Sequence, residues 1–459
     1  MSDVLLVYPP HRIILGGRTY SPLGLAYMAS VLEKNGFSVR ILDFDVVGFD
    51  SKKLFEVIEC EKPRVIGVNV LTSALPEAYL IVALIKSRFD IPIVLGGSHV
   101  TEVPEVVSDM GVEYGIRGEG DYAFLRLCEH LITGNAGLDE VGGLVLNDGG
   151  STTYSEPVFV DGLDGLPNPA WHLLDMRKYL FKTLMASRGC PFNCIFCADP
   201  HCTVRHRCGE NVLDEMRLLR DEYGVRRVDF SDSVFTLDKD WVYGLCDMMD
   251  RERLNLKWTC LTRVDCVDDD ILSRMKDSGC FLIYFGVESG VEEIRFNSGK
   301  RITNDEIRHA FRYCRKIGVK TGSSAMFGFP GENIHQMRDT LRFIIELDPE
   351  YGVFSLPELM PGTRLFKTAL SEGYATDDLW RDYMSGMVKD LYYVPKGLSF
   401  SELYEVDLEA HRRFYYRPSY ILRRMAGIRS RIEFSETADA FIRYVSNNIT
   451  NKIPDNGIS

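Results

Sequence analysis

Short apolar runs alternate with helical patterns along the first third of the chain. The runs are four to six residues long and rich in β-branched residues, which is typical of strands buried on both faces of a sheet. The predicted strands are Val4–Val7, Ser38–Asp43, Val65–Val70 and Pro92–Leu95, and the predicted helices between them are Leu23–Asn35, Ser51–Glu61 and Pro76–Phe89. This alternation predicts a doubly wound, Rossmann-like α/β domain over residues 1–150, with helices on both faces of a parallel sheet.

The same alternation resumes after a stretch of turn-forming residues. Residues 151–180 are rich in Gly, Pro and Asp, which predicts a linker. Six further strand patterns, each followed by a helical or turn pattern, fit a partial (β/α)6 barrel of TIM type over residues 181–365. The predicted strands are Lys182–Ser187, Arg227–Ser231, Lys257–Leu261, Phe281–Gly286, Val319–Phe327 and Tyr351–Leu356. Residues 366–459 have a mostly helical pattern and are expected to form a C-terminal accessory or substrate-side domain.

Composition limits the class of protein. The chain has 459 residues, 45% of them hydrophobic and 26% charged, which is typical of a globular protein with two to four domains. The net charge of −13 argues against a general nucleic-acid binder. No apolar run approaches the roughly 20 residues that span a bilayer, and no basic residue precedes the first apolar stretch, so neither a membrane span nor a signal peptide is predicted.

Cysteine and arginine are unevenly placed. Most of the twelve cysteines are scattered, as in a protein with reduced thiols, so we expect a cytoplasmic location. Seven arginines and no acidic residue lie between His411 and Arg431. This run indicates either a solvated helix face or a docking surface for an acidic partner.

Three cysteines follow the first predicted barrel strand at short spacing. Cys190, Cys194 and Cys197 fit one tight loop that binds three irons of a [4Fe–4S] cluster and leaves the fourth iron without a protein ligand. The alternative is a zinc site, which needs a fourth N or S ligand. Candidates for that ligand are His201, Cys202, His206 and Cys208.

Glycine-rich turns follow several strands of the first domain. They bring backbone N–H groups close to a ligand, which favours a nucleotide-like or phosphate-bearing molecule. Neither the Gly-x-Gly-x-x-Gly pattern of dinucleotide-binding domains nor a P-loop is present after the first strand.

The cysteine loop, with Phe196 before its last cysteine, resembles the radical S-adenosylmethionine (SAM) superfamily. The strand-end motifs look like the cobalamin-binding domain that precedes many radical SAM enzymes, and with the loop the resemblance covers roughly residues 1–365. The motifs are Tyr8-Pro-Pro10, Ser21–Ala29, Leu95–His99 and Arg117–Asp121. The resemblance implies three cofactors: a [4Fe–4S] cluster, SAM, and cobalamin in its methyl form. No Asp-x-His-x-x-Gly motif is present, so no histidine of that motif binds cobalt from below, which suits radical transfer of the methyl group.

The same resemblance implies site residues at the strand ends. For SAM they are Phe196, Asp232, Arg263, Glu288, Ser324 and Gly328. For cobalamin they are Tyr8, Pro10, Leu23, Gly24, Leu71, Thr72, Gly96, Gly97, Ser98, Gly118, Glu119 and Gly120. A structural explanation stands beside two of them, since Arg263 can pair with Asp265 and Glu288 can simply end a strand.

The function implied is that of a cobalamin-dependent radical SAM C-methyltransferase. Such an enzyme methylates an unactivated sp3 carbon by way of a 5′-deoxyadenosyl radical and methylcobalamin, and we name no catalytic acid or base. A narrower hypothesis is a protein or peptide substrate, the glutamine of methyl-coenzyme M reductase, held by the basic, aromatic tail. The alternatives are a ring-forming enzyme without net methylation and a non-catalytic cobalamin sensor. We expect an electron donor such as ferredoxin or flavodoxin, no nucleic acid or membrane partner, and a monomer.

Overall fold

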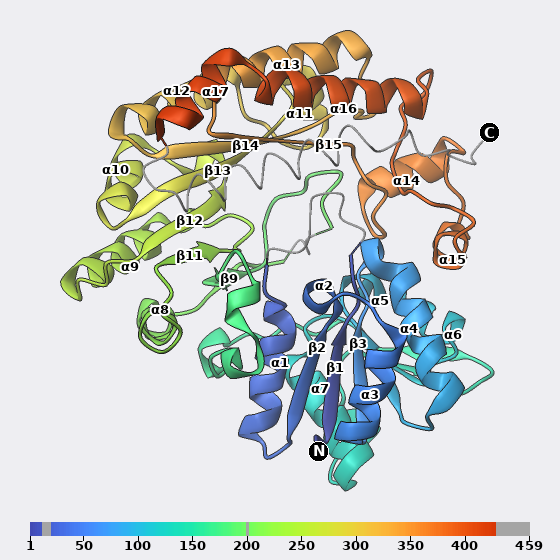
Figure 1. The fold of residues 1–459 in the computed structure, drawn as a ribbon. Helices are drawn as coiled ribbons and strands as arrows, with labels where there is room; N and C mark the ends of the chain where they lie inside the picture. The colour runs from blue at the N-terminus through green and yellow to red at the C-terminus, as the bar shows by residue number, and fades with distance from the viewer. Residues whose placement is uncertain (12–19, 199–201, 428–459) are drawn as a thin grey trace. The chain divides into compact units, whose positions relative to one another are not determined.

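The computed structural model describes residues 1–11, 20–198 and 202–427 (Figure 1). They form two compact units. The first contains the described residues up to Thr183 together with Thr376–Lys389, and the second contains Leu184–Ala375 and the described residues from Asp390 onward.

A seven-stranded sheet forms the centre of the first unit, in the order β2-β1-β3-β4-β5-β6-β7. The first five strands are parallel, and the last two are antiparallel. The strands are β1 (Val4–Tyr8), β2 (Val39–Asp43), β3 (Val65–Asn69), β4 (Ile93–Gly96), β5 (Tyr114–Ile116), β6 (Leu144–Asn147) and β7 (Thr152–Tyr154). The strand order reverses between β1 and β3, and ligands of such sheets bind at the carboxyl ends on either side of that point.

Helices cover both faces of this sheet (Figure 1). The long helices are α1 (Leu23–Lys34), α3 (Ser51–Glu61), α4 (Leu75–Arg88) and α7 (Gly120–Cys128), and the short ones are α2 (Phe44–Val47), α5 (Ser98–Glu102) and α6 (Val106–Asp109). Local signals explain their starts, since the Asp50 carboxylate accepts a hydrogen bond from Lys52 N at the start of α3 and Pro76 lies in the first turn of α4. The doubly wound domain predicted from the sequence is confirmed.

Two later segments also belong to the first unit. Residues 151–180, expected as a linker, pack here because Leu163 and Trp171 are buried and Ala170 N donates to Ala26 O at 3.0 Å. Helix α15 (Leu379–Ser385), expected within the C-terminal domain, packs against α4. The chain therefore returns to the first unit after the barrel strands. No local sequence pattern indicates this return.

The second unit contains six strands in sequential order, β8 to β15. They are β8 (Thr183–Leu184), β11 (Arg227–Phe230), β12 (Lys257–Thr262), β13 (Cys280–Glu288), β14 (Lys320–Met326) and β15 (Tyr351–Ser355). The helices are α8 (Gly209–Tyr223), α9 (Lys239–Arg251), α10 (Asp269–Asp277), α11 (Glu292–Asn297), α12 (Asn304–Ile317), α13 (Ile334–Leu347), α14 (Arg364–Ser371), α16 (Phe400–Tyr415) and α17 (Pro418–Gly427). Strands β11 to β15 pair in parallel, and the predicted partial barrel is confirmed.

Helices α16 and α17 use much of the arginine run to hold themselves to the unit. Arg417 and Arg423 both pair with Asp348, Arg424 pairs with Glu350, and Arg413 pairs with Glu409 on α16. These four arginines are therefore engaged inside the unit, whereas Arg429 and Arg431 lie outside the described residues. In the described part of the chain, no helix combines the length and apolarity needed to cross a bilayer.

Candidate functional site

A short two-stranded sheet holds the cysteine loop at both ends. Strand β9 (Ser187–Arg188) enters the loop and pairs antiparallel with β10 (Arg205–His206) beyond it. Gly189 has a φ of +98°, and a Cβ at this position would lie 2.8 Å from Cys202 Sγ, so the turn requires glycine. Within the loop, Cys197 N donates to Cys194 O at 3.3 Å.

The three cysteines lie at or just below the surface, with Cys190 buried and Cys194 and Cys197 half-buried. Burial raises the pKa of the Cys194 thiol, and the positive charges of Lys300 and Arg263 oppose that rise. Because only a thiolate binds iron, these two cations favour the ligating form.

The donor set fits an iron–sulfur cluster. In the described residues no three His, Cys, Asp or Glu side chains lie close enough to hold a single metal ion. Thiolates that each bind a different iron stand farther apart than ligands of one ion, and all three come from one loop. His201, a candidate zinc ligand, lies outside the described residues.

Backbone contacts fasten the loop to the second unit. Ile195 N donates to Ser298 O at 3.0 Å, and Leu365 N donates to Ile195 O at 2.8 Å. The Arg364 guanidinium donates to Asn193 O. Phe192 stands between the first two cysteines in the sequence, and the Arg263 guanidinium lies 3.7 Å from the centroid of its ring. Sequence reasoning missed these anchors because all of them join residues far apart in the chain.

Glu288 and Ser324, two of the predicted SAM residues, lie next to each other. The Glu288 carboxylate is buried and accepts a hydrogen bond from the Lys300 ammonium at 2.7 Å. It also lies 3.4 Å from Ser324 Oγ. Glu288 adopts the left-handed backbone conformation at a φ of +61°, which is costly for a residue other than glycine. The sequence offered no signal for Lys300, which follows β13 by twelve residues.

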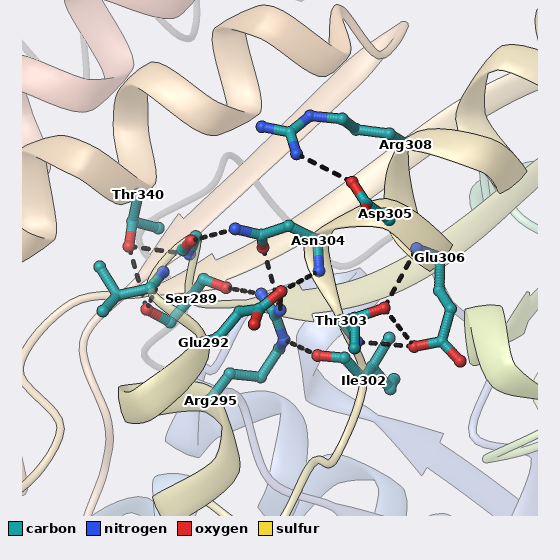
Figure 2. Close-up of polar contacts among 12 residues, drawn as sticks. Ser289, Glu292, Arg295, Ile302, Thr303, Asn304, Asp305, Glu306, Arg308 and Thr340 are labelled. Carbon is teal, nitrogen blue, oxygen red and sulfur yellow. Dashed lines mark hydrogen bonds and ion pairs between the residues drawn. The ribbon is translucent and has the colours of Figure 1, made fainter.

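A buried arginine explains how this strained strand end is held (Figure 2). Arg295 on α11 is fully buried and donates to Ser289 O, to Ile302 O at 2.7 Å and to Asn304 Oδ1 at 2.9 Å. The Thr340 hydroxyl accepts a hydrogen bond from Gly290 N at 3.0 Å. The network closes the segment from Ser289 to Asn304 into a loop, and that loop carries Lys300.

Asp232 and Arg263 are engaged within the protein. The Asp232 carboxylate accepts hydrogen bonds from Ala186 N at 3.2 Å and Ser187 Oγ at 2.5 Å, so it holds the strand that leads into the cysteine loop. Burial raises the pKa of Asp232 to about 6 against these hydrogen bonds. Arg263 forms the bidentate pair with Asp265 that the sequence left open, and its Nη1 is buried without a partner. The SAM contacts of both residues stay predictions.

Phe196 and Gly328 lie beside the same turn. The Phe196 ring contacts Phe329 at a centroid distance of 5.6 Å. Gly328 has a φ of +103°, and the N–H groups of Gly328 and Phe329 both donate to the Glu332 carboxylate, at 2.8 and 3.0 Å. Glu332 therefore shapes the turn that carries Gly328, one of the residues predicted to bind SAM.

The Glu332 carboxyl gives a testable pH dependence. Burial raises its pKa to about 7, against two hydrogen bonds that lower it, so the folded state binds the proton more tightly than the unfolded state does. Stability is therefore lost as pH rises from the ordinary glutamate range through pH 7, by roughly 2–3 kcal/mol from pH 5 to pH 8. We expect Glu332→Gln to remove that part of the slope in urea unfolding at several pH values. An unchanged slope would contradict the burial argument.

In the first unit, several predicted cobalamin residues surround the switch point of the sheet. Tyr8 ends β1, while Leu71 and Thr72 follow β3 and lead into a 3-10 turn, Thr72–Ala74. Gly97 has a φ of +109° and packs so closely on the end of β3 and the residue after it that a Cβ would lie 2.6 Å from Asn69 Oδ1 and 2.7 Å from Val70 O. Pro10, Leu23, Gly24, Gly96 and Ser98 are half-buried or exposed at the same ends of the strands and at the start of α1.

A buried histidine supports the turn after β3. His99 Nδ1 lies 3.0 Å from Thr72 Oγ1, and Trp380 of α15 meets the imidazole edge-on at 5.5 Å. Burial lowers the pKa of His99 to about 4, so the ring is neutral. Sequence reasoning did not predict the role of Trp380, because this residue lies on α15, far along the chain from His99.

Two backbone N–H groups of the turn Gly118–Gly120 already donate to other groups of the protein. Thr101 Oγ1 accepts from Gly118 N at 2.9 Å, and Val158 O accepts from Glu119 N at 2.7 Å. A Cβ at Gly118 would lie 2.3 Å from Val158 O, so the close neighbour that requires glycine there is the chain after β7. The predicted cobalamin contact stays a prediction for all three residues.

Comparison with known proteins gives the family. The protein-family model described as "Radical SAM superfamily" matches residues 184–344, and the model described as "B12 binding domain" matches residues 15–128. An uncharacterized methyltransferase of Pyrococcus horikoshii is 30% identical over 440 residues, covering 92% of this chain and 94% of that protein. The chain belongs to the cobalamin-dependent radical SAM methyltransferase family. Its cofactors are a [4Fe–4S] cluster, SAM and cobalamin.

Other relatives agree with this assignment. The cytidylyl-2-hydroxyethylphosphonate methyltransferase of Streptomyces wedmorensis is 27% identical over 91% of this chain and 90% of its own length. The cobalamin-dependent radical SAM enzyme OxsB has the same fold, with a TM-score of 0.75 at 17% identity over 97% of this chain and 72% of that one. The radical SAM methyltransferase TsrM of Kitasatospora setae has a TM-score of 0.68 at 21% identity over 80% of this chain and 76% of that one.

Proposed function

We propose that this methyltransferase transfers a methyl group to an unactivated sp3 carbon. The observation that carries the proposal is the Glu288–Lys300 ion pair beside the cysteine loop. An amino acid such as the methionine part of SAM carries a carboxylate and an ammonium, and this pair presents the matching cation and anion. When bound, the cluster, SAM and cobalamin supply the electron, the organic radical and the methyl group of the reaction.

The chain's own residues have three tasks in this proposal. Cys190, Cys194 and Cys197 hold the cluster, and Glu288, Ser324 and Lys300 orient the amino acid part of SAM. Phe196, packed on Phe329, offers an apolar face to the adenine. Glu288, Lys300, Ser324 and Phe196 are already fixed by a hydrogen bond, an ion pair or a ring contact, so binding at these residues needs little reordering.

Two classes of substrate, a peptide and a small molecule, are candidates for this methyltransferase. The glutamine of methyl-coenzyme M reductase, suggested by the aromatic and basic tail, is a peptide substrate. By its name, the relative from Streptomyces wedmorensis acts on cytidylyl-2-hydroxyethylphosphonate. A further relative, the tryptophan 2-C-methyltransferase of Streptomyces laurentii, acts by its name on tryptophan, and both compounds are small molecules. A direct comparison of the two classes of substrate therefore comes first.

The test is an anaerobic turnover assay with SAM that carries a deuterated methyl group. We expect about four irons and one cobalt per chain, and mass spectrometry should find 5′-deoxyadenosine together with a substrate heavier by one labelled methyl. A glutamine-containing peptide and the small molecules are assayed side by side, with Cys194→Ala as the inactive control. Formation of 5′-deoxyadenosine with an unlabelled, ring-closed product would overturn the proposal in favour of the cyclase alternative.

A further inference from the structure

The segment that leads into the cysteine loop is held by two residues that come later in the chain. Met185 and Ala186 lie between β8 and β9, directly before the loop. The Asp232 carboxylate accepts hydrogen bonds from Ala186 N and Ser187 Oγ. Arg207 N donates to Ala186 O at 2.8 Å, and the Arg207 guanidinium donates to Met185 O at 2.9 Å. Both backbone carbonyls at the entrance of the loop are therefore bound by one arginine.

The Arg207 side chain is anchored in turn by helix α8. It is 2% exposed, and its ion-pair partner at 2.5 Å is Glu215 of α8, whose side chain is fully buried. Asn211 of α8 accepts from the same guanidinium, at 2.6 Å through its side chain and at 3.2 Å through its backbone carbonyl. The planar guanidinium points its N–H groups in fixed directions, so its position relative to α8 decides where Met185 O lies.

The main chain of Arg207 holds the exit of the loop. Arg205 and His206, the two residues before it, form β10 and pair with β9 across the loop. Trp241 Nε1 of α9 donates to Arg207 O at 2.8 Å, and the Trp241 ring lies 5.3 Å from the His206 ring. Arg207 therefore fastens both ends of the cysteine loop, the entrance by its guanidinium and backbone N–H and the exit by its carbonyl.

A buried ion pair is a poor way to gain stability alone. Taking two charges out of water costs about as much as their attraction returns, and an apolar pair of similar volume is often equally stable. Its hydrogen bonds are directional, however, so they fix the bonded groups more narrowly than apolar packing does. Such precision matters at this loop, because three thiolates of one segment must each reach a different iron.

We propose that Arg207 is a positioning residue for the iron–sulfur cluster and for the binding of SAM to it. It acts through the main chain of Met185 and Ala186, as the groups behind a metal ligand do in other metal sites. The Arg207–Glu215 pair fixes the loop, and the loop fixes the three thiolates. The inference goes beyond the proposed methylation, because it concerns the cluster and SAM and holds whatever the methyl acceptor is.

The test replaces the ion pair by apolar side chains of similar size in the cluster-loaded full chain. We expect Arg207→Met/Glu215→Met to keep the urea midpoint of the wild type and about four irons per chain, because no charge is left buried without its partner. The electron paramagnetic resonance (EPR) spectrum of the reduced cluster should change. The Kd for SAM in calorimetry should rise about tenfold, which corresponds to about 1.4 kcal/mol. Wild-type stability with a wild-type spectrum and SAM affinity would overturn the proposal.

Arg207→Lys tests the same idea with the charge retained. Lysine can still pair with Glu215, but it lacks the fork that also reaches Met185 O and Asn211. We expect this variant to fold, to keep its iron and to lose SAM affinity about tenfold. Unchanged SAM affinity in Arg207→Lys would equally contradict the positioning role.

Arg217→Met is the matched control on the same helix. Arg217 follows Glu215 by two residues and pairs with Asp214 and Glu252 at the surface. Its loss should leave the EPR spectrum as in the wild type and the Kd for SAM within about twofold. An effect in Arg217→Met equal to that in the Arg207 variants would assign the change to α8 as a whole and overturn the proposal.

Discussion

Cys194→Ala is expected to remove the iron–sulfur cluster while leaving the protein folded. The side chain is one of three thiols in a single loop, and two ligands from that loop cannot hold the cube against solvent and oxidation. The fold survives because the loop is fastened by the backbone of Ile195 to Ser298 and Leu365, and neither bond uses the cysteine side chain. Iron per chain should fall from about four to well below one, and the visible absorbance of the cluster should disappear.

A matched variant distinguishes the cluster from the zinc alternative. Cys202 lies just beyond the loop, where its sulfur packs against Gly189, and it was one of the candidates for a fourth zinc ligand. Cys202→Ala should keep the full iron content, with at most a small loss of thermal stability. Equal loss of metal in Cys194→Ala and Cys202→Ala, with zinc in the wild type, would contradict the cluster assignment.

The sequence predicted the sheets well because their strands are buried runs with strong local signals. Val4–Val7 and Tyr351–Leu356 lie within about one residue of β1 and β15. Strands β5 to β7 were missed because β5 has three residues and β6 and β7 are partly exposed at the edge, where no buried run develops.

The candidate site was predictable only where residue type and spacing carry the chemistry. The cysteine triad is local, so spacing alone located it. Lys300, Phe192 and Trp380 are placed by contacts between distant segments, and a single lysine or aromatic residue has no signal of its own. Asp232 and Gly118 show the converse limit, since each has the expected residue type at a strand end but is satisfied by the protein itself.

Buried polar side chains at the end of β13 contribute both to the stability of the fold and to the geometry of the candidate SAM site. The left-handed conformation of Glu288 costs free energy. The hydrogen bonds around Arg295 stabilise this conformation (Figure 2). The Arg295 guanidinium donates to the backbone carbonyls of Ser289 and Ile302, which would otherwise be buried without a hydrogen-bond donor. Strain at a strand end that carries a candidate SAM residue, here Glu288, is typical of functional sites.

Arg295→Met should therefore be among the most damaging single changes outside the cysteines. Methionine fills a similar volume but leaves the carbonyls of Ser289 and Ile302 and the Asn304 amide without their donor. Each unsatisfied buried group costs about 1–3 kcal/mol, so we expect the free energy of unfolding to fall by about 3–5 kcal/mol in urea titrations.

Arg308→Met provides the matched control on the next helix. Arg308 pairs with Asp305 and Glu346 in solvent, and such exposed pairs contribute less than about 1 kcal/mol. Because the Arg295 network carries Lys300 and Glu288, Arg295→Met should also weaken SAM binding at least tenfold in calorimetry on the folded, cluster-loaded protein, whereas Arg308→Met should not. A stability loss in Arg295→Met with unchanged SAM affinity would show that the network supports the fold but does not position the Lys300–Glu288 pair.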